Sequence, residues 1–176
     1  MGMIESAASM MLGLAVSASA GVLSASDDEP ALGNPVQLTF PEQFIKAGEA
    51  YFSPDTAIGR GKIIFQAVPA GAEGDNNYSM YVADLVWEGP QPIGIENVIE
   101  VSQPGSANTC GWFHPTREGE ILFGTTTVPP QDSATPGYQR GTGRYQWQFP
   151  SEMQIATMTI GQRAIAEPLF ERDGYT

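Results

Sequence analysis

The stretches Ala50-Tyr51-Phe52-Ser53-Pro54 and Gly111-Trp112-Phe113-His114-Pro115 decide the fold, because each places two aromatic residues before a polar residue and a proline. Self-similarity at a regular interval, here about sixty residues from Phe52 to Phe113, is the sequence signature of a repeat architecture. If this chain is a repeat, further matched pairs should follow both stretches in the same order.

Two further pairs do follow. Lys62-Ile63-Ile64-Phe65 matches Glu120-Ile121-Leu122-Phe123 at nearly the same spacing, and residues 79–85 match residues 152–158 at a longer one. In each piece, apolar residues alternate with polar ones or form short runs bounded by Pro and Gly, which is typical of β-strands. Four short antiparallel strands per repeat are the signature of a propeller blade. The sequence therefore predicts an all-β fold of about two four-stranded antiparallel blades.

The composition fits such a fold and excludes several classes of protein. Among 176 residues, 20 Gly and 14 Pro indicate many turns, while 41% apolar residues are too many for a disordered chain. The net charge of −12 opposes binding to nucleic acid, whose phosphates are neutralised by Lys and Arg. One Cys and one His exclude an intramolecular disulfide framework and a multi-His zinc site.

The first unit also resembles a known family. Gly48-Glu49-Ala50-Tyr51-Phe52-Ser53-Pro54-Asp55, followed by residues 63–66 and 80–85, resembles the TolB-like, WD-repeat-like β-propeller repeat of bacterial envelope proteins. That repeat has an aromatic-Ser-Pro-Asp-Gly turn between two strands, followed by an Ile-Tyr-Val-x-Asp-Leu strand. Residues 109–115 look like the second blade of exported TolB-like proteins. The resemblance extends from about residue 36 to the C-terminus, although neither unit keeps Asp-Gly after its proline.

The N-terminus is typical of a secretory signal peptide. An apolar run, Met10 to Val16, precedes Ala18-Ser19-Ala20, which offers an A-x-A cleavage site, although Glu5 stands where a basic region is usual. A transmembrane span is disfavoured because about 20 apolar residues are needed. Residues 1–20 are therefore predicted as a signal peptide of a periplasmic or secreted protein. A disordered or weakly helical tail is the alternative.

The remaining chain divides into a linker, residues 21–35, and a partial propeller, residues 36–176. Blade one is expected at about 36–102, blade two at about 103–166, and the start of a third at about 167–176. Propellers typically close with about 4–8 blades, so the expected propeller is incomplete. Unpaired strand edges and inter-blade faces would then favour self-association of the chain. A complete small β-sheet protein is the alternative.

A long insertion lies between the second and third predicted strands of the second unit. It holds a cluster of aromatic residues interleaved with arginines, which are enriched at interface hot spots. These residues form the candidate interaction loop: Tyr138, Arg140, Arg144, Tyr145 and Trp147. We expect partners among envelope or extracellular proteins. The alternative is that the aromatic rings only pack over the propeller rim.

The other reactive side chains have structural interpretations. His114 occupies the position of Ser53, before a proline, where a polar side chain caps a turn. Cys110 is predicted to be a buried free thiol at the start of a strand. Gly141-Thr142-Gly143 is too short for a dinucleotide loop, and Asp75 is expected in a hairpin turn. No catalytic, metal or cofactor site is predicted.

These observations predict a non-catalytic, exported β-propeller module that binds a protein or ligand in the cell envelope. The alternative is the propeller portion of a longer, prolyl-oligopeptidase-like hydrolase, whose catalytic domain would follow Thr176. A downstream G-x-S-x-G nucleophile motif would favour the hydrolase. Further propeller repeats before a stop codon would favour the binding module.

Overall fold

The protein is all-β in the part that the computed structural model describes, which is residues 35–72, 77–131, 137–138, 147–161 and 167–168. Within these ranges the chain forms ten strands and no helix, so the all-β class predicted from the sequence is confirmed. None of the described segments is a helix of the length and apolarity that crossing a membrane requires.

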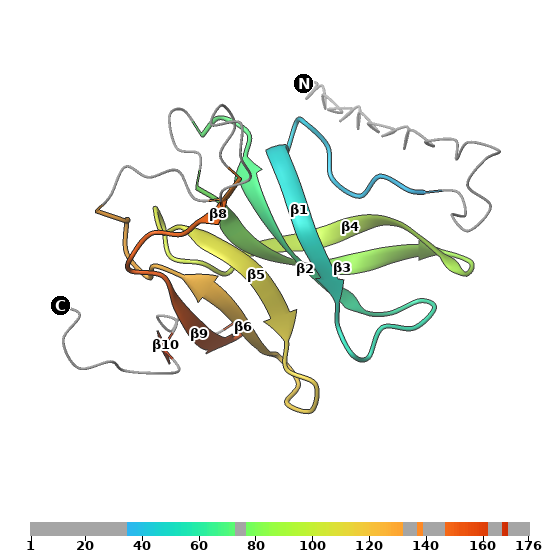
Figure 1. Ribbon diagram of the computed structural model, residues 1–176. Coiled ribbons are helices and arrows are strands. Elements are labelled where there is room, and N and C mark those ends of the chain that lie inside the picture. The colour runs from blue at the N-terminus through green and yellow to red at the C-terminus, as the bar shows by residue number, and fades with distance from the viewer. Residues whose placement is uncertain (1–34, 73–76, 132–136, 139–146, 162–166, 169–176) are drawn as a thin grey trace, which may run out of the picture.

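Sheet one contains the first four strands of the chain in sequential antiparallel order, β1-β2-β3-β4 (Figure 1). The strands are β1 (Phe44–Phe52), β2 (Lys62–Pro69), β3 (Ser79–Glu88) and β4 (Gln91–Glu100). The central strands, β2 and β3, have short continuous apolar runs because side chains on both of their faces are buried.

Sheet two repeats this arrangement in the order β5-β6-β9-β10, and neither sheet closes on itself. Three of its strands have six residues and the last has two: β5 (Asn108–Phe113), β6 (Glu120–Thr125), β9 (Gln154–Thr159) and β10 (Glu167–Pro168). A separate two-stranded ribbon, β7 (Gly137–Tyr138) with β8 (Trp147–Gln148), lies between β6 and β9 in the sequence. The insertion therefore has the predicted place in the strand order.

The strand register confirms the first two predicted matches of the repeat. Phe52 of β1 pairs with Ile63 of β2, and Phe113 of β5 pairs with Ile121 of β6. The same positions thus face one another in the first hairpin of each sheet. Residues that the sequence comparison matched at these positions therefore occupy equivalent positions in the two sheets.

The third predicted match is wrong by two positions. The Leu85 amide donates to the Gly61 carbonyl, at 3.0 Å, and the Ile160 amide donates to the Gly119 carbonyl, at 2.8 Å. Leu85 is therefore equivalent to Ile160 rather than to Met158. A shift of two leaves every side chain on the same face of a strand. The apolar pattern alone could not detect the error.

The two sheets pack against each other through a shared apolar core, which we call the inter-sheet core. Sheet one contributes side chains from β2 and β3, and sheet two contributes side chains from β5, β6 and β9. Val101 comes from the connection between the sheets. The buried members are Ile64, Met80, Val82, Val101, Phe113, Ile121, Phe123 and Ala156. All of them are at most 6% exposed, so the contact between the sheets excludes water.

The packing is head-to-tail, because the two sheets use opposite faces to make it. Ile121 of sheet two points into the inter-sheet core, but its equivalent, Ile63, lies in a second cluster on the other face of sheet one. Conversely, Ile64 is in the inter-sheet core, and its equivalent, Leu122, alternates to the outer face of sheet two. Such a heterologous contact leaves one unmatched face at each end.

The outer face of sheet one is partly covered by an aromatic cluster and by Leu38, from the segment before β1. The Phe44 ring meets the rings of Phe65 and Tyr81 edge-on, with centroid distances of 5.5 and 5.0 Å. Edge-to-face geometry is favoured between aromatic rings. The cluster covers this face only in part, because Phe52, opposite Ile63 on the same face, is 56% exposed.

A buried polar segment joins the two sheets. The Val101 amide donates to the Met80 carbonyl at 2.8 Å, and the Met80 amide donates to Ser102 Oγ at 3.0 Å. Asn108, only 3% exposed, donates from Nδ2 to the Tyr78 carbonyl at 2.8 Å. These bonds satisfy backbone groups that would be costly to bury unpaired.

A glycine allows β5 to approach sheet one closely. A Cβ atom on Gly111 would lie 2.4 Å from Met80 Cε and 2.6 Å from Ile64 Cδ1. Both distances are far shorter than a carbon–carbon contact of about 3.5–4.0 Å. The missing side chain therefore sets how tightly the sheets pack.

Candidate functional site

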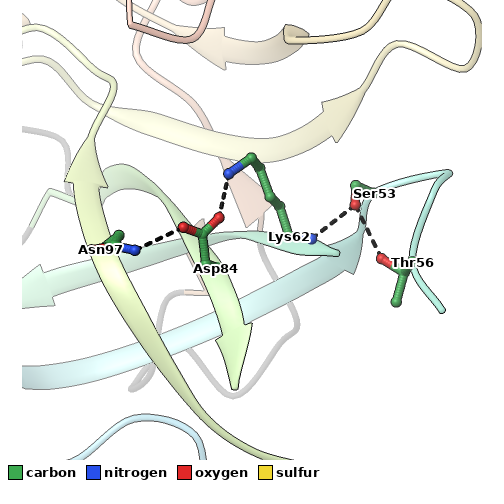
Figure 2. Close-up of polar contacts among 5 residues, drawn as sticks. All are labelled: Ser53, Thr56, Lys62, Asp84 and Asn97. Atoms are coloured by element: carbon green, nitrogen blue, oxygen red, sulfur yellow. Dashed lines mark hydrogen bonds and ion pairs between the residues drawn. The ribbon is translucent and has the colours of Figure 1, made fainter. Parts of the chain in front are cut away.

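The turn between β1 and β2 is held by Ser53, which is 7% exposed. Its Oγ accepts a hydrogen bond from the Lys62 amide at 2.9 Å and shares another with Thr56 Oγ1 at 3.0 Å (Figure 2). Gly61 has a φ of +123°, and a Cβ there would lie 2.4 Å from Thr56 Oγ1. Ser53 and Gly61 therefore close this turn tightly.

The equivalent turn between β5 and β6 is held by His114. Its Nδ1 accepts hydrogen bonds from the amides of Thr116, at 3.2 Å, and Arg117, at 2.9 Å. The predicted turn-capping role of His114 is confirmed. Because Nδ1 is an acceptor, the neutral imidazole carries its proton on Nε2. Two different side chains thus perform the same local task in the two units.

These two turns line a single cleft of about 550 Å³. That volume lies within the range of small-ligand and peptide sites. The cleft has apolar surface from both prolines, Pro54 and Pro115, and from Phe113 and Ile160. Its charged lining residues are Asp55, Arg60, Lys62, Arg117, Glu118 and Glu120.

The basic residues of the cleft are oriented by hydrogen bonds. Lys62 Nζ pairs with Asp84, whose other carboxylate oxygen accepts from Asn97 Nδ2 at 2.9 Å (Figure 2). These bonds, from Lys62 first and Asn97 second, hold the pKa of Asp84 below its ordinary value. Arg117 pairs with Glu120 at 2.7 Å. The cleft consequently offers positioned donors as well as acceptors.

Cations of the described chain concentrate at this cleft. The described ranges contain four basic residues, and only Lys46 among them lies outside the lining. Arg60 is held from the first turn, because its Nε donates to the Asp55 carbonyl at 3.1 Å. The lining thus balances three basic side chains against three acidic ones in a chain of net charge −12, and both repeat units supply its basic groups.

A second surface is the outer face of sheet two, which we call the open face. Its apolar side chains are Trp112, Leu122 and Ile155, and the same register also places Gly124, Thr157, Thr159 and the charged Glu120 on this face. Trp112 is 49% exposed and Ile155 is 51% exposed. Large apolar side chains that are exposed together mark interaction sites more often than isolated ones do.

Cys110 is exposed, and the prediction of a buried thiol is wrong. The register of β5 with β6 shifts between Thr109 and Trp112, and Cys110 has a φ of 53° in this bulge. Glu49 has a φ of 45° at the equivalent bulge of β1, and its Oε2 accepts from Cys110 Sγ at 3.1 Å. A bulge breaks the alternation on which the prediction relied.

Desolvation raises the pKa of the Cys110 thiol, and the Glu49 carboxylate adds to the increase. Both effects disfavour the thiolate, which is the reactive form of cysteine. A hydrogen bond with Thr109 Oγ1, 3.2 Å from the same sulfur, opposes this increase in the pKa only in part. The geometry at this paired bulge holds a protonated thiol.

The candidate interaction loop is described only at its two ends. Tyr138 and Trp147 are directly opposite one another in the β7–β8 ribbon. Arg140, Arg144 and Tyr145 lie outside the described residues.

Several other predictions also concern positions outside the described residues. They include the signal peptide at residues 1–20, nearly all of the linker at 21–35, and the Asp75 turn. Among the described residues, no group of three or more His, Cys, Asp or Glu is arranged to hold a metal ion.

No family model, curated protein or solved structure matches the chain.

The cleft and the open face were not predicted from the sequence. The repeat contained a signal for the cleft, because Ser53-Pro54 and His114-Pro115 are equivalent turns that adjacent units would bring to the same end of the molecule.

Proposed function

We propose that this chain is a non-catalytic binding module, built from two consecutive propeller-type blades, that acts outside the cytoplasm in the cell envelope. The TolB-like resemblance and the A-x-A site of the sequence underlie the proposed fold and location. The observation that carries the binding role is the convergence of two equivalent turns on one cleft. Its proposed ligand is an exposed segment of an envelope or extracellular protein.

The head-to-tail packing supports the blade interpretation. A heterologous contact repeated by rotation generates a ring, which is how blades surround a propeller axis. β5 contacts β1, β2 and β3, so the first strands of the two sheets are neighbours. β4 and β10 are the last strands of their sheets, and Figure 1 shows them on opposite sides of the molecule.

The chemistry of the cleft supports binding to a polypeptide. Apolar surface from Pro54, Pro115 and Phe113 lies among oriented side-chain donors and acceptors. Binding sites commonly combine mostly apolar surface with a few placed polar groups. Ser53 Oγ and His114 Nδ1, two groups with catalytic potential elsewhere, already accept backbone hydrogen bonds here. Their engagement in turn structure favours binding over catalysis.

The test uses the purified full chain as bait for envelope proteins of the source cells. The double variant Arg60→Ala with Arg117→Ala removes one cation from each turn, while Lys46→Ala removes the described cation outside the cleft. We expect the double variant to recover at least about tenfold less partner, since hot-spot arginines contribute about 2 kcal/mol or more. Recovery with Lys46→Ala should equal that of the unchanged chain.

A third variant separates the cleft from the candidate interaction loop. Tyr145→Ala with Trp147→Ala should leave partner recovery unchanged if the cleft is the binding surface. Loss of the partner with this variant, and not with the cleft variant, would assign binding to the loop. Equal recovery by all variants, or no specific partner, would contradict the proposed use of the cleft.

A further inference from the structure

Two equivalent aromatic residues meet where the first strands of the two sheets contact each other. The rings of Tyr51 in β1 and Trp112 in β5 have centroids 4.6 Å apart and an interplanar angle of 53°. Tyr51 is 36% exposed and Trp112 is 49% exposed. We call these two residues the aromatic pair. Their tilted rings leave part of their surface open to a ligand.

A carboxylate lies beside the aromatic pair. Glu49 Oε2 accepts hydrogen bonds from Thr109 Oγ1, at 3.4 Å, and from Cys110 Sγ, at 3.1 Å. Thr109 and Trp112 lie on the same face of sheet two, because their partners in β6 are two residues apart. Such neighbours are separated by about 7 Å along a strand. A small group placed between them can therefore contact both the Glu49 carboxylate and the Trp112 ring.

The charge of Glu49 is not neutralised within the described part of the chain. Neither of the two ion pairs between described residues involves it. Glu120, the charged residue that shares a face with Trp112, pairs with Arg117 instead. Lys46, three residues before Glu49, lies over the Tyr78 ring, with its Nζ 4.6 Å from the centroid. The aromatic pair thus has a negative charge beside it that a ligand could balance.

These groups together suit a compact cation. Ring faces attract a cation that lies within about 6 Å of their centroids, and a carboxylate adds a full negative charge. Because Oε2 of Glu49 already accepts from two donors, a ligand meets mainly Oε1. A single oxygen suits an ammonium group better than the bidentate fork of a guanidinium. The net charge of −12 also attracts cations to the molecule.

We propose that the aromatic pair and Glu49 form a binding site for an alkylammonium group. The charged nitrogen lies between the carboxylate and the rings, and its alkyl substituents contact the ring faces. The group belongs either to a lysine side chain of another protein or to a free small molecule. Neither Tyr51, Trp112 nor Glu49 lines the cleft, so the inference does not rest on the proposed function.

The test is a titration of two probes with the full chain, followed by NMR of the probe. Choline is the free alkylammonium compound, and N-acetyl-lysine methylamide carries the charge on a peptide unit. We expect a saturable upfield shift of the protons next to the charged nitrogen, because the rings shield them. The probe that binds more tightly identifies the source of the group. The uncharged carbon analogue of choline, 3,3-dimethyl-1-butanol, should bind about tenfold more weakly or less.

Three variants assign the shift to the site. Trp112→Leu should abolish the upfield shift, and Tyr51→Leu and Glu49→Gln should each weaken binding about threefold or more. Phe52→Leu is the matched aromatic control, because Phe52 is 56% exposed but lies on the other face of β1. Glu42→Gln is the matched charge control at an exposed position before β1. Both controls should bind the probes as the unchanged chain does.

Three results would overturn the proposal. One is the absence of a saturable shift with either probe. Another is equal binding of choline and its uncharged analogue, which would indicate a merely apolar surface. The third is an equal loss in Glu49→Gln and Glu42→Gln, which would assign binding to the net charge of the chain.

Glu49→Gln keeps the shape of its side chain, so it decides the matter even if an aromatic variant does not fold. The cleft residues are unchanged in all these variants. Failure of this test therefore leaves the partner-recovery test of the cleft independent.

Discussion

Sheet one and sheet two have the same strand order, the same hairpin register and the same bulge in their first strand, yet their burial differs. Sheet two covers one face of sheet one, and Leu38 with the aromatic cluster covers part of the other, where Phe52 is 56% exposed. Sheet two is covered on one face only. The comparison shows that the residues of each unit determine its strand order, whereas the burial of a sheet face depends on what packs against that face.

Residue choice reflects this difference. At the position where sheet one has the buried Val82, sheet two has the half-buried Thr157. Threonine keeps the β-branched shape that suits a strand but tolerates water on its hydroxyl. The open face of sheet two therefore tolerates partial exposure to water at this position.

The largest effect should come from truncating equivalent residues in the two sheets. Met80→Ala should lower the free energy of unfolding by about 3 kcal/mol, because it leaves a cavity in the inter-sheet core. Ile155→Ala, on the open face, should cost less than about 1 kcal/mol. Urea unfolding measures both values. Similar losses in the two variants would show that the faces are equally buried in solution.

Gly111→Val should break the close contact between the sheets. The added side chain would overlap Met80 and Ile64, and overpacking typically costs about 1–3 kcal/mol. Gly48→Val in β1 is the matched control, since nothing lies within 4 Å of a Cβ at that position. Thermal melting should separate the two variants clearly. An unaffected Gly111→Val would mean that the sheets are further apart than described.

Asn108→Ala should weaken the connection between the sheets. It would leave the Tyr78 carbonyl without its side-chain donor, at a cost of about 1–3 kcal/mol. Denaturant unfolding gives the loss, and hydrogen exchange in β5 should accelerate in parallel. A loss no larger than that of an ordinary surface substitution would indicate that water replaces the amide without penalty.

The smallest effect concerns a charge present in sheet one alone. Asp84 pairs with Lys62, while the equivalent position of sheet two holds Thr159. Because the folded state lowers the pKa of Asp84, its contribution is present above the ordinary aspartate pKa of about 3.9 and is lost as pH falls through the lower folded value. The pair is partly exposed, so we expect less than about 1 kcal/mol.

Asp84→Asn measures this contribution. The stability difference from the unchanged chain should be present at neutral pH and shrink in strong acid. In a Lys62→Ala background the same substitution should have a smaller effect, which a double-mutant cycle would detect. A difference that is constant with pH would assign the loss to packing instead of charge.

The strand plan of both sheets could be predicted because its signals are local. An aromatic pair followed by a polar residue and Pro ends a strand, and alternating apolar residues indicate the next one. The capping role of His114 followed from the same comparison with Ser53. These features depend on residues close together in the chain.

The remaining features depend on the relation between distant segments. The predicted match of β3 with β9 was wrong by two positions. The apolar pattern could not reveal this error, because a shift of two leaves every side chain on the same face. Cys110 was wrongly placed in the interior because its bulge has no signature in residue type. The cleft and the open face arise from the way one sheet packs on the other, which no single stretch specifies.

The paired bulge has a consequence for the redox chemistry of the molecule. Cys110 is the sole cysteine of the sequence, so no disulfide can form within these 176 residues. Its raised pKa leaves little thiolate at neutral pH, and thiolate is the species that attacks disulfides and oxidants. An exposed sulfur beside Glu49 is thereby slow to react, which would allow this thiol to persist in an oxidising environment.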